Sequence, residues 1–165
     1  MALILNGTDG LSDVDGTAAT PAIRGTDANT GIFFPAADTI AFSEGGTEQM
    51  RLNSAGDLQM NSGYGSVATA YGCRAWVNFN GTGTVAIRAS GNVSSITDNG
   101  TGDYTLNFTT AMPDANYSLV VSSTFGSANG FSGLAPTTTA ARISSYTPAT
   151  GAGLDSVFIC VSVFR

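Results

Sequence analysis

The sequence contains no histidine and no lysine, so its six basic side chains are all arginines. Without histidine there is no Ser-His-Asp or Cys-His nucleophile pair, and without lysine there is no phosphate-binding P-loop and no Schiff base. Paired carboxylates could still cleave a glycan, but residues 73–165 contain no Glu, and Asp98 and Asp103 flank an Asn-Gly turn that favours a structural role for both. We therefore expect no catalytic residue and no enzymatic activity.

Charged residues are scarce, at 11%, and they are unevenly distributed. Residues 1–72 hold eight acidic side chains and two arginines, whereas residues 73–165 hold four of each, so the first part carries the whole net charge of −6. Neither part has the clustered Lys and Arg side chains that a protein needs to bind along the phosphate backbone of a nucleic acid. We expect no binding to nucleic acid.

Cysteine and long apolar runs are also nearly missing. Cys73 and Cys160 are too distant in sequence for a metal-ligand pair and too few for a disulfide framework, so we expect two buried free thiols. After Met1, the N-terminal apolar stretch Ala2–Leu5 is four residues long and has no basic residue before it. We therefore expect neither a signal peptide nor membrane insertion.

Two patterns suggest a bound ion or cofactor, but their context argues against both. Three aspartates lie within residues 9–15, yet a twelve-residue calcium loop that began at Asp13 would place Arg24 where a bidentate Glu is needed. The segment 61–72 fits the dinucleotide fingerprint G-x-G-x-x-A, but the sequence predicts a new strand near residue 73 instead of a long helix. We expect no metal and no cofactor. The fingerprint residues are Gly63, Gly65 and Ala68.

The sequence is rich in glycine, with 21 residues, and in small polar residues, which favour short strands and tight turns over helices. With 42% hydrophobic residues it can still bury a core. We predict an all-β fold in four parts. These are an extended N-terminal arm at 1–20, a short-stranded motif at 21–62, a linker at 63–72, and an antiparallel, jelly-roll-like β-sandwich head at 73–165.

The first 60 residues offer only short apolar pieces between turn residues. The arm has hardly any apolar run, and the pieces that follow it are three to five residues long. Strands this short bury too little surface to be stable alone, so we expect partners in trans. The expected strands are 22–24, 32–34, 39–43, 49–52 and 57–60.

The segments TPAIRG, NTGIFFPAADTIAFS and GGTEQMRLNSAGDLQM resemble a motif of tail-fibre and related virion surface proteins of bacteriophages, particularly cyanobacterial and marine phages. The resemblance covers Pro21 to Met60. The positions that carry it are Pro21–Ile23, Asn29–Pro35, Ala37–Asp38, Gly46–Thr47, Arg51 and Gly56–Asp57.

This resemblance implies a structural virion protein on the tail or capsid surface, assembled in the host cytoplasm. One copy of the motif is typical of a short tail fibre that attaches the particle to the host cell. We further expect a homo-oligomer, a trimer, because the strands of the first part are too short to be stable alone and the last strand is apolar on both faces, and we expect residues 1–60 to bind other virion proteins. A capsid decoration or cement protein, and a free lectin-like carbohydrate-binding module, are the alternatives.

Residues 73–165 show seven evenly spaced strand patterns, which favour a sandwich. Trp76 falls on the face opposite the alternating apolar residues, and we assign it to packing, with binding as the alternative. The expected strands are 74–79, 84–89, 93–98, 104–109, 117–124, 141–146 and 157–164. The expected inward side chains are Ala75, Val77, Phe79, Val85, Ile87, Tyr104, Leu106, Phe108, Leu119 and Val121.

The last stretch, Asp155–Arg165, is apolar on both faces, which is typical of a strand covered on both sides. It lies inside the sandwich, or another copy of the chain covers one of its faces. One face carries Val157 and three further β-branched residues, and the other carries Phe158, Cys160 and Phe164. We assign the oligomer interface to Val157, Phe158, Ile159, Val161, Val163 and Phe164.

Two longer connections, 125–139 and 147–154, are the candidates for recognition because loops on a rigid sandwich often carry it. Aromatic and amide groups in the first loop suit a host surface glycan, and the head's zero formal charge suits neutral sugars. A neighbouring arginine could hold one carboxylate. The equal alternative is that both loops only connect strands or pack against another subunit. The candidate receptor-binding residues are Phe125, Asn129, Phe131 and Arg142.

Overall fold

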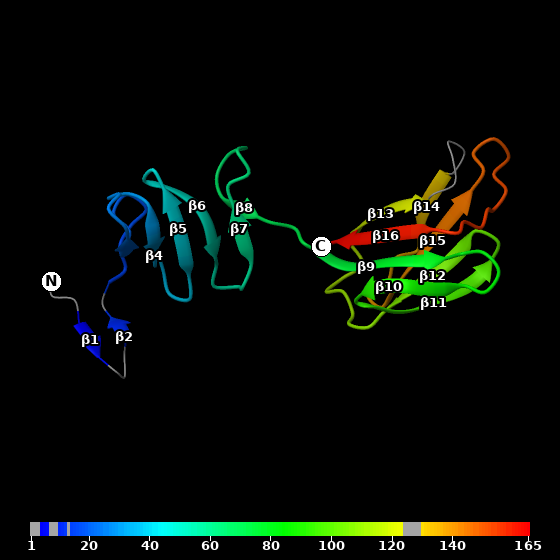
Figure 1. Ribbon diagram of the computed structural model, residues 1–165, viewed down its shortest axis with the longest axis horizontal. Coiled ribbons are helices and arrows are strands. Elements are labelled where there is room, and N and C mark those ends of the chain that lie inside the picture. The colour runs from blue at the N-terminus through cyan, green and yellow to red at the C-terminus, as the bar shows by residue number, and fades with distance from the viewer. Residues whose placement is uncertain (1–3, 7–9, 13, 124–129) are drawn as a thin grey trace. The chain divides into compact units, whose positions relative to one another are not determined.

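The computed structural model describes residues 4–6, 10–12, 14–123 and 130–165, with the backbone alone for the first two ranges. Within these residues it has 16 strands in four antiparallel sheets and no helix, which confirms the all-β prediction (Figure 1). It follows that no described helix is long and apolar enough to span a membrane. The chain divides into two compact units, Met1–Ala70 (unit 1) and Tyr71–Arg165 (unit 2).

Unit 1 is built from short strands joined in sequence order. A hairpin of β1 (Ile4–Asn6) and β2 (Gly10–Ser12) comes first. The next six strands form one antiparallel sheet, of which Figure 1 shows β4 to β8 side by side in a single layer. The expected linker at 63–72 thus contributes a strand, β8, to this sheet. The six strands are β3 (Ile23–Arg24), β4 (Gly31–Phe33), β5 (Ile40–Glu44), β6 (Thr47–Leu52), β7 (Leu58–Met60) and β8 (Ala68–Thr69).

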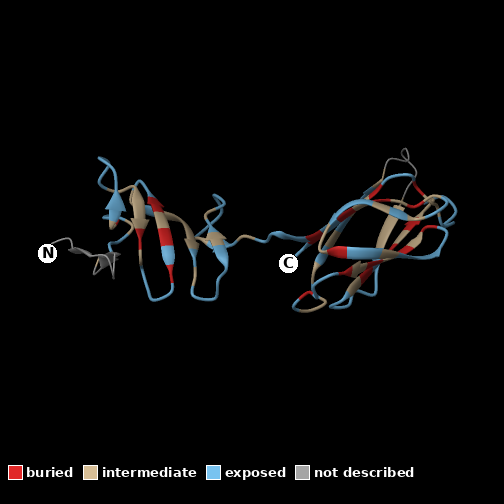
Figure 2. Ribbon diagram, turned by 60° about the horizontal axis from the view of Figure 1, so that its bottom comes forward, coloured by how far each residue is buried: buried red, intermediate tan, exposed pale blue. Residues whose placement is uncertain are grey.

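One face of the unit 1 sheet is covered by the chain that precedes β3. Phe33 and Ala41 are cross-strand partners on this face, and both are buried. Pro21 is also buried and packs on this face. Gly31 shares the face with Phe33, and a Cβ added to Gly31 would lie 3.0 Å from the Cβ of Pro21. The amide of Phe34 donates to the carbonyl of Asp15 at 2.8 Å and ties the preceding segment to the sheet. Figure 2 shows how few strands of unit 1 carry buried residues.

Unit 2 is a sandwich of two four-stranded antiparallel sheets, in the orders β10-β9-β16-β13 and β11-β12-β15-β14. Inward side chains of both sheets form one core, in which the largest fully buried side chains are Tyr104, Phe79, Leu106, Ile143 and Ile159. The strands are β9 (Cys73–Asn80), β10 (Ala86–Gly91), β11 (Val93–Gly100), β12 (Asp103–Phe108), β13 (Ser118–Ser123), β14 (Gly130–Leu134), β15 (Ala140–Tyr146) and β16 (Ile159–Phe164).

The inward alternation expected in unit 2 is confirmed, because all ten predicted side chains lie in the core or pack against it. The strand count differs by one. β14 lies within 125–139, where the sequence predicts a connection, because its residues GFSGL show no clear apolar alternation. It pairs with β15 along its whole length and extends the second sheet.

Candidate functional site: exposed sheet faces

The four residues expected to bind a glycan do not form one exposed group among the described residues. Phe131 lies in β14 opposite Ser145, and since directly opposed residues share a sheet face, both lie on the inner face, where Ser145 is fully buried. Arg142 lies on the outer face of the neighbouring strand. Phe125 and Asn129 lie outside the described residues.

Arg142 is also engaged with a carboxylate of its own chain. Its Nε donates to Oδ1 of Asp103 at 2.7 Å, and its Nη2 contacts Oδ2 of the same carboxylate. This hydrogen bonding lowers the pKa of Asp103 and raises the pKa of Arg142. A ligand carboxylate would have to displace Asp103, so the expected role of Arg142 loses its physical basis.

The second expected loop, residues 147–154, is a compact turn. The amide of Thr147 donates to the carbonyl of Ala152 at 2.8 Å, and the amide of Leu154 donates to the carbonyl of Ser145 at 2.9 Å. A Cβ on Gly153 would also meet the backbone of Thr101. These contacts give the loop a packing role within unit 2.

The predicted oligomer interface separates into two groups of side chains. Ile159, Val161 and Val163 are at most 1% exposed, because β16 is a central strand whose inner face points into the core of unit 2. Assigning these three residues to an interface between copies is therefore wrong. Val157 and Phe158 precede β16, and together with Phe164 they remain about two-fifths exposed.

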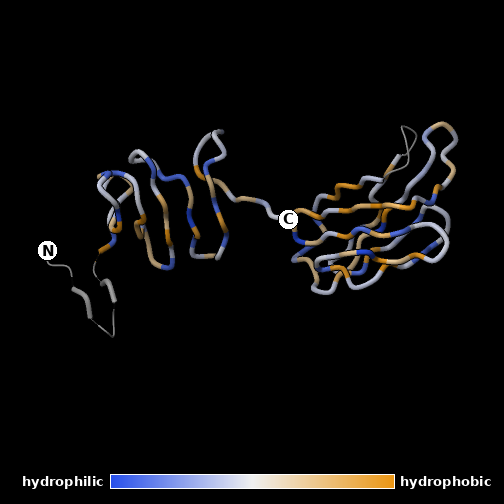
Figure 3. The backbone as a smooth tube through the Cα atoms, in the orientation of Figure 1, coloured by the Kyte–Doolittle hydropathy of each residue, from blue (hydrophilic) through white to orange (hydrophobic). Residues whose placement is uncertain are grey.

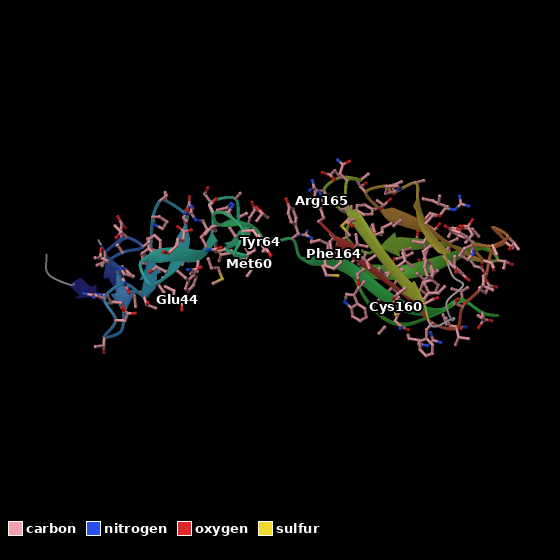
Figure 4. All side chains as sticks on the ribbon, turned by 90° about the horizontal axis from the view of Figure 1, so that it is seen from above. Glu44, Met60, Tyr64, Cys160, Phe164 and Arg165 are labelled. Carbon is pink, nitrogen blue, oxygen red and sulfur yellow. The ribbon has the colours of Figure 1, made fainter. Side chains whose placement is uncertain are left out.

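The outer side of the same sheet carries several exposed apolar side chains. We call the outer surface of β10, β9, β16 and β13 the outer head face. Trp76 is 44% exposed and Val120 56% exposed, and the register places them on either side of Ser162. Cys160 and Phe164, labelled in Figure 4, belong to the same face. The outer surface of the opposite sheet instead carries polar groups such as Thr97, Thr105 and Asn107.

The two thiols are not buried, contrary to the prediction. Cys73 is exposed and Cys160 is half-buried, and both are free. They also lie apart along β16, because Cys73 pairs with Phe164 and Cys160 pairs with Asn78. The Nδ2 amide of Asn78 donates to the sulfur of Cys160 at 3.0 Å.

Besides the outer head face of unit 2, the unit 1 sheet carries an exposed apolar surface on the side opposite Phe33 and Ala41. We call it the unit 1 apolar face. One row of side chains crosses all six strands in register, and a shorter row runs beside it. The five largest exposed members are between 42% and 46% exposed. Figure 3 shows hydrophobic residues recurring along these strands. The rows are Ile23, Ile32, Phe42, Met50, Met60 and Ala68, and then Ile40, Leu52 and Leu58.

The described residues offer no metal centre and no dinucleotide site. Among them, no three His, Cys, Asp or Glu side chains gather into a possible metal site. Asp9 and Asp13 lie outside the described residues. In the fingerprint pattern, Ala68 belongs to strand β8, so the helix that would hold a pyrophosphate does not follow.

Comparisons with protein-family models, with curated proteins and with solved structures found no match to this chain.

Proposed function

We propose that this chain is a structural protein of a bacteriophage particle, a short tail fibre that assembles as a homo-oligomer and attaches the particle to the host cell surface. The motif of residues 21–60 supports the class of protein. The division into two units supports separate tasks, with unit 1 for assembly and unit 2 for display. The unit 1 apolar face carries the proposal.

The physical argument is that a single-layer sheet with one bare apolar face is poorly stabilised by its own chain. Burial of apolar surface contributes about 25 cal/mol per Å², and isolated short strands are marginal in water. Monomeric proteins rarely leave large continuous apolar patches open. Side chains such as Leu52, Leu58 and Met60, each at least 43% exposed, would gain burial if the same face of another copy covered them.

Three copies around one axis would turn their unit 1 apolar faces toward one another and close the assembly. The number of copies that we propose is three. Residues 1–60 would in addition bind other proteins of the particle, because a fibre needs an attached end.

The assembly is tested with two substitutions at adjacent positions of β7. Leu58 lies on the unit 1 apolar face, and Gln59 lies on the other face beside Arg51. Leu58→Asp would bury a charge between copies, so we expect light scattering to show loss of the oligomer, or circular dichroism to show loss of the unit 1 sheet. Gln59→Asp carries the same charge change and is expected to leave the mass unchanged. A wild-type protein that sediments as a monomer with full β circular dichroism would contradict the proposal.

The place in the particle is tested by gold labelling of the chain on intact virions. We expect label on the tail, whereas label on the shell would identify a decoration protein. A chain without residues 1–60 should keep the unit 2 fold and no longer enter particles. Incorporation at the wild-type level would contradict the division of tasks and favour a free lectin-like module.

A further inference from the structure

We propose that the outer head face binds an anionic sugar, a glycan unit that carries a carboxylate or a sulfate, with Trp76 and Arg88 as its principal contacts. This inference rests on the proposed attachment function and names the receptor chemistry. It moves the binding surface from the loops, where the sequence places it, to a sheet face. Three observations support it: the Trp76 indole is exposed over Gly91, Arg74 and Arg88 take part in none of the described ion pairs, and polar side chains lie next to the indole.

The indole of Trp76 lies over the backbone of Gly91, its partner on the edge strand β10. A Cβ on Gly91 would come within 2.5 Å of Nε1 and 2.9 Å of Cδ1 of the indole. The glycine therefore makes room for the indole, which remains 44% exposed. A sugar ring has an apolar C–H face and a polar rim, so a broad exposed aromatic surface is a suitable platform for it.

Two arginines on the same face have no acidic partner within the described part of the chain. Arg74, Trp76 and Asn78 alternate along β9 with buried residues and so share the outer face. Arg88 reaches this face from β10, where its guanidinium carbon lies 4.0 Å from the centroid of the Phe158 ring. Among the described residues, neither Arg74 nor Arg88 takes part in any of the three ion pairs.

The acidic groups of unit 2 are all engaged by other groups of the unit. Asp103 pairs with Arg142, and Asp114 pairs with Arg165. Asp98 accepts from the amide of Gly100, and Asp155 accepts from Tyr104 and Gly102. The four strands of the outer head face contain no acidic residue. The face is therefore aromatic and positively charged, although unit 2 as a whole is neutral.

The charge also decides between a sugar and a second copy of the chain as the occupant. Two outer head faces packed against each other would bury arginines of the same sign without a carboxylate between them, which is costly. An anionic sugar supplies the missing charge, and a guanidinium can bind a carboxylate or a sulfate through two hydrogen bonds. Asn78 and Ser162 lie next to Trp76 and can meet sugar hydroxyls.

The spacing suits a small ligand. Asn78 lies two residues from Trp76, which is about 7 Å along a strand, and Arg88 contacts Asn78 at 3.5 Å. One sugar unit on the indole would therefore place its acidic group, or that of the next unit, within reach of Arg88.

The test uses the full-length protein and three probes: an oligomer of galacturonic acid, a sulfated dextran oligomer and a neutral dextran oligomer. Trp76 is the single tryptophan of the chain, so its fluorescence reports binding at this face directly. We expect a saturable change with one or both anionic probes, weakened by added salt, and none with the neutral probe. The anionic probe that binds identifies the source of the charge. Equal binding of the neutral probe, or no binding of either anionic probe, would overturn the proposal.

Two pairs of variants, followed by calorimetry, locate the site. Arg88→Gln is expected to weaken binding about tenfold, because a charge-assisted hydrogen bond is lost. Arg142→Gln removes the same charge from the opposite sheet and should leave binding unchanged. Trp76→Ala should abolish binding, whereas Tyr64→Ala, which removes a highly exposed aromatic residue of unit 1, should have no effect. Equal losses within either pair would show non-specific attraction and overturn the assignment.

Circular dichroism and light scattering of each variant keep this result separate from the proposed function. An Arg88→Gln protein that folds and enters particles at the wild-type level, but binds the anionic probe as before, overturns the inference alone. If Trp76→Ala instead lowers the oligomer mass, the outer head face is occupied by another copy. That result overturns the sugar proposal and leaves the proposed assembly standing.

Discussion

Tyr104 joins three segments of unit 2 through a single side chain. Its ring is fully buried and packs edge-on against Phe79, with the centroids 5.2 Å apart. Its hydroxyl lies 2.9 Å from the carbonyl of Gly81 and 2.6 Å from Oδ1 of Asp155, so it links two turns across the end of the sandwich. Burial, and then the hydrogen bond to Asp155, raise the pKa of Tyr104 far above its ordinary value of 10.0.

This shift predicts a loss of unit 2 stability at alkaline pH. Above about pH 10, Tyr104 releases its proton in the unfolded chain but keeps it in the folded one, so the unfolded state binds fewer protons. The free energy of unfolding should therefore fall as pH rises, by at most about 1.4 kcal/mol per pH unit from this residue, and be unaffected well below pH 10. Urea unfolding followed by Trp76 fluorescence between pH 8 and 11.5 measures it.

Tyr104→Phe is the control for the alkaline prediction. It removes the titrating hydroxyl, so the slope should become shallower, with a remainder from Tyr117, whose pKa burial also raises. Loss of the buried hydrogen bonds should lower stability at pH 8 by about 1–3 kcal/mol. A variant with the wild-type alkaline slope would show that another group causes the effect.

At the scale of elements, β16 shows how one strand serves two surfaces. Its inner residues belong to the core, and its outer residues Cys160 and Ser162 are half-buried, with the exposed Trp76 and Val120 on either side of Ser162. The stretch is apolar on both faces because the inner side meets the second sheet and the outer side forms part of an exposed surface. Which side is which depends on the second sheet, which comes from distant parts of the chain.

We predict that neighbouring substitutions in β16 differ sharply in their cost. Ile159→Ala leaves a cavity in the core and should lower the free energy of unfolding by about 2–5 kcal/mol. Cys160→Ser changes the opposite face and should cost less than about 1 kcal/mol. Urea unfolding followed by Trp76 fluorescence measures both. If Ile159→Ala instead dissociated an oligomer without a loss of stability, the side chain would belong to an interface after all.

At the scale of the whole molecule, the two units differ in how they are stabilised. Unit 2 closes two sheets over one core of its own, whereas the large apolar side chains of unit 1 lie mainly on one bare face. Because unit 2 has its own hydrophobic core, we expect it to fold as a single copy. Unit 1 lacks a second layer within the described residues.

This contrast predicts different behaviour for the separated units. Residues 71–165 alone should be folded and unfold cooperatively at the same urea midpoint as unit 2 in the full chain. Residues 1–70 alone should form their sheet only when associated, so their β circular dichroism should increase with protein concentration along with the mass seen by light scattering. A monomeric, cooperatively folded 1–70 fragment at micromolar concentration would contradict the argument.

The sequence by itself determined the absence of histidine and lysine, the all-β class and the side chains that share a strand face, because composition and alternation are local properties. The tertiary structure decided which of those faces are buried against another part of the chain and which are exposed to solvent. It enclosed Ile159 and left Trp76 exposed over Gly91, and within the described residues it paired Arg142 with a carboxylate but not Arg88. It also added β8 and β14, which show no clear apolar alternation and pair with β7 and β15. The layer that buries a face, the partner of an ion pair and the strand edge available for pairing depend on segments outside the strand itself. Alternation along one strand therefore cannot specify them.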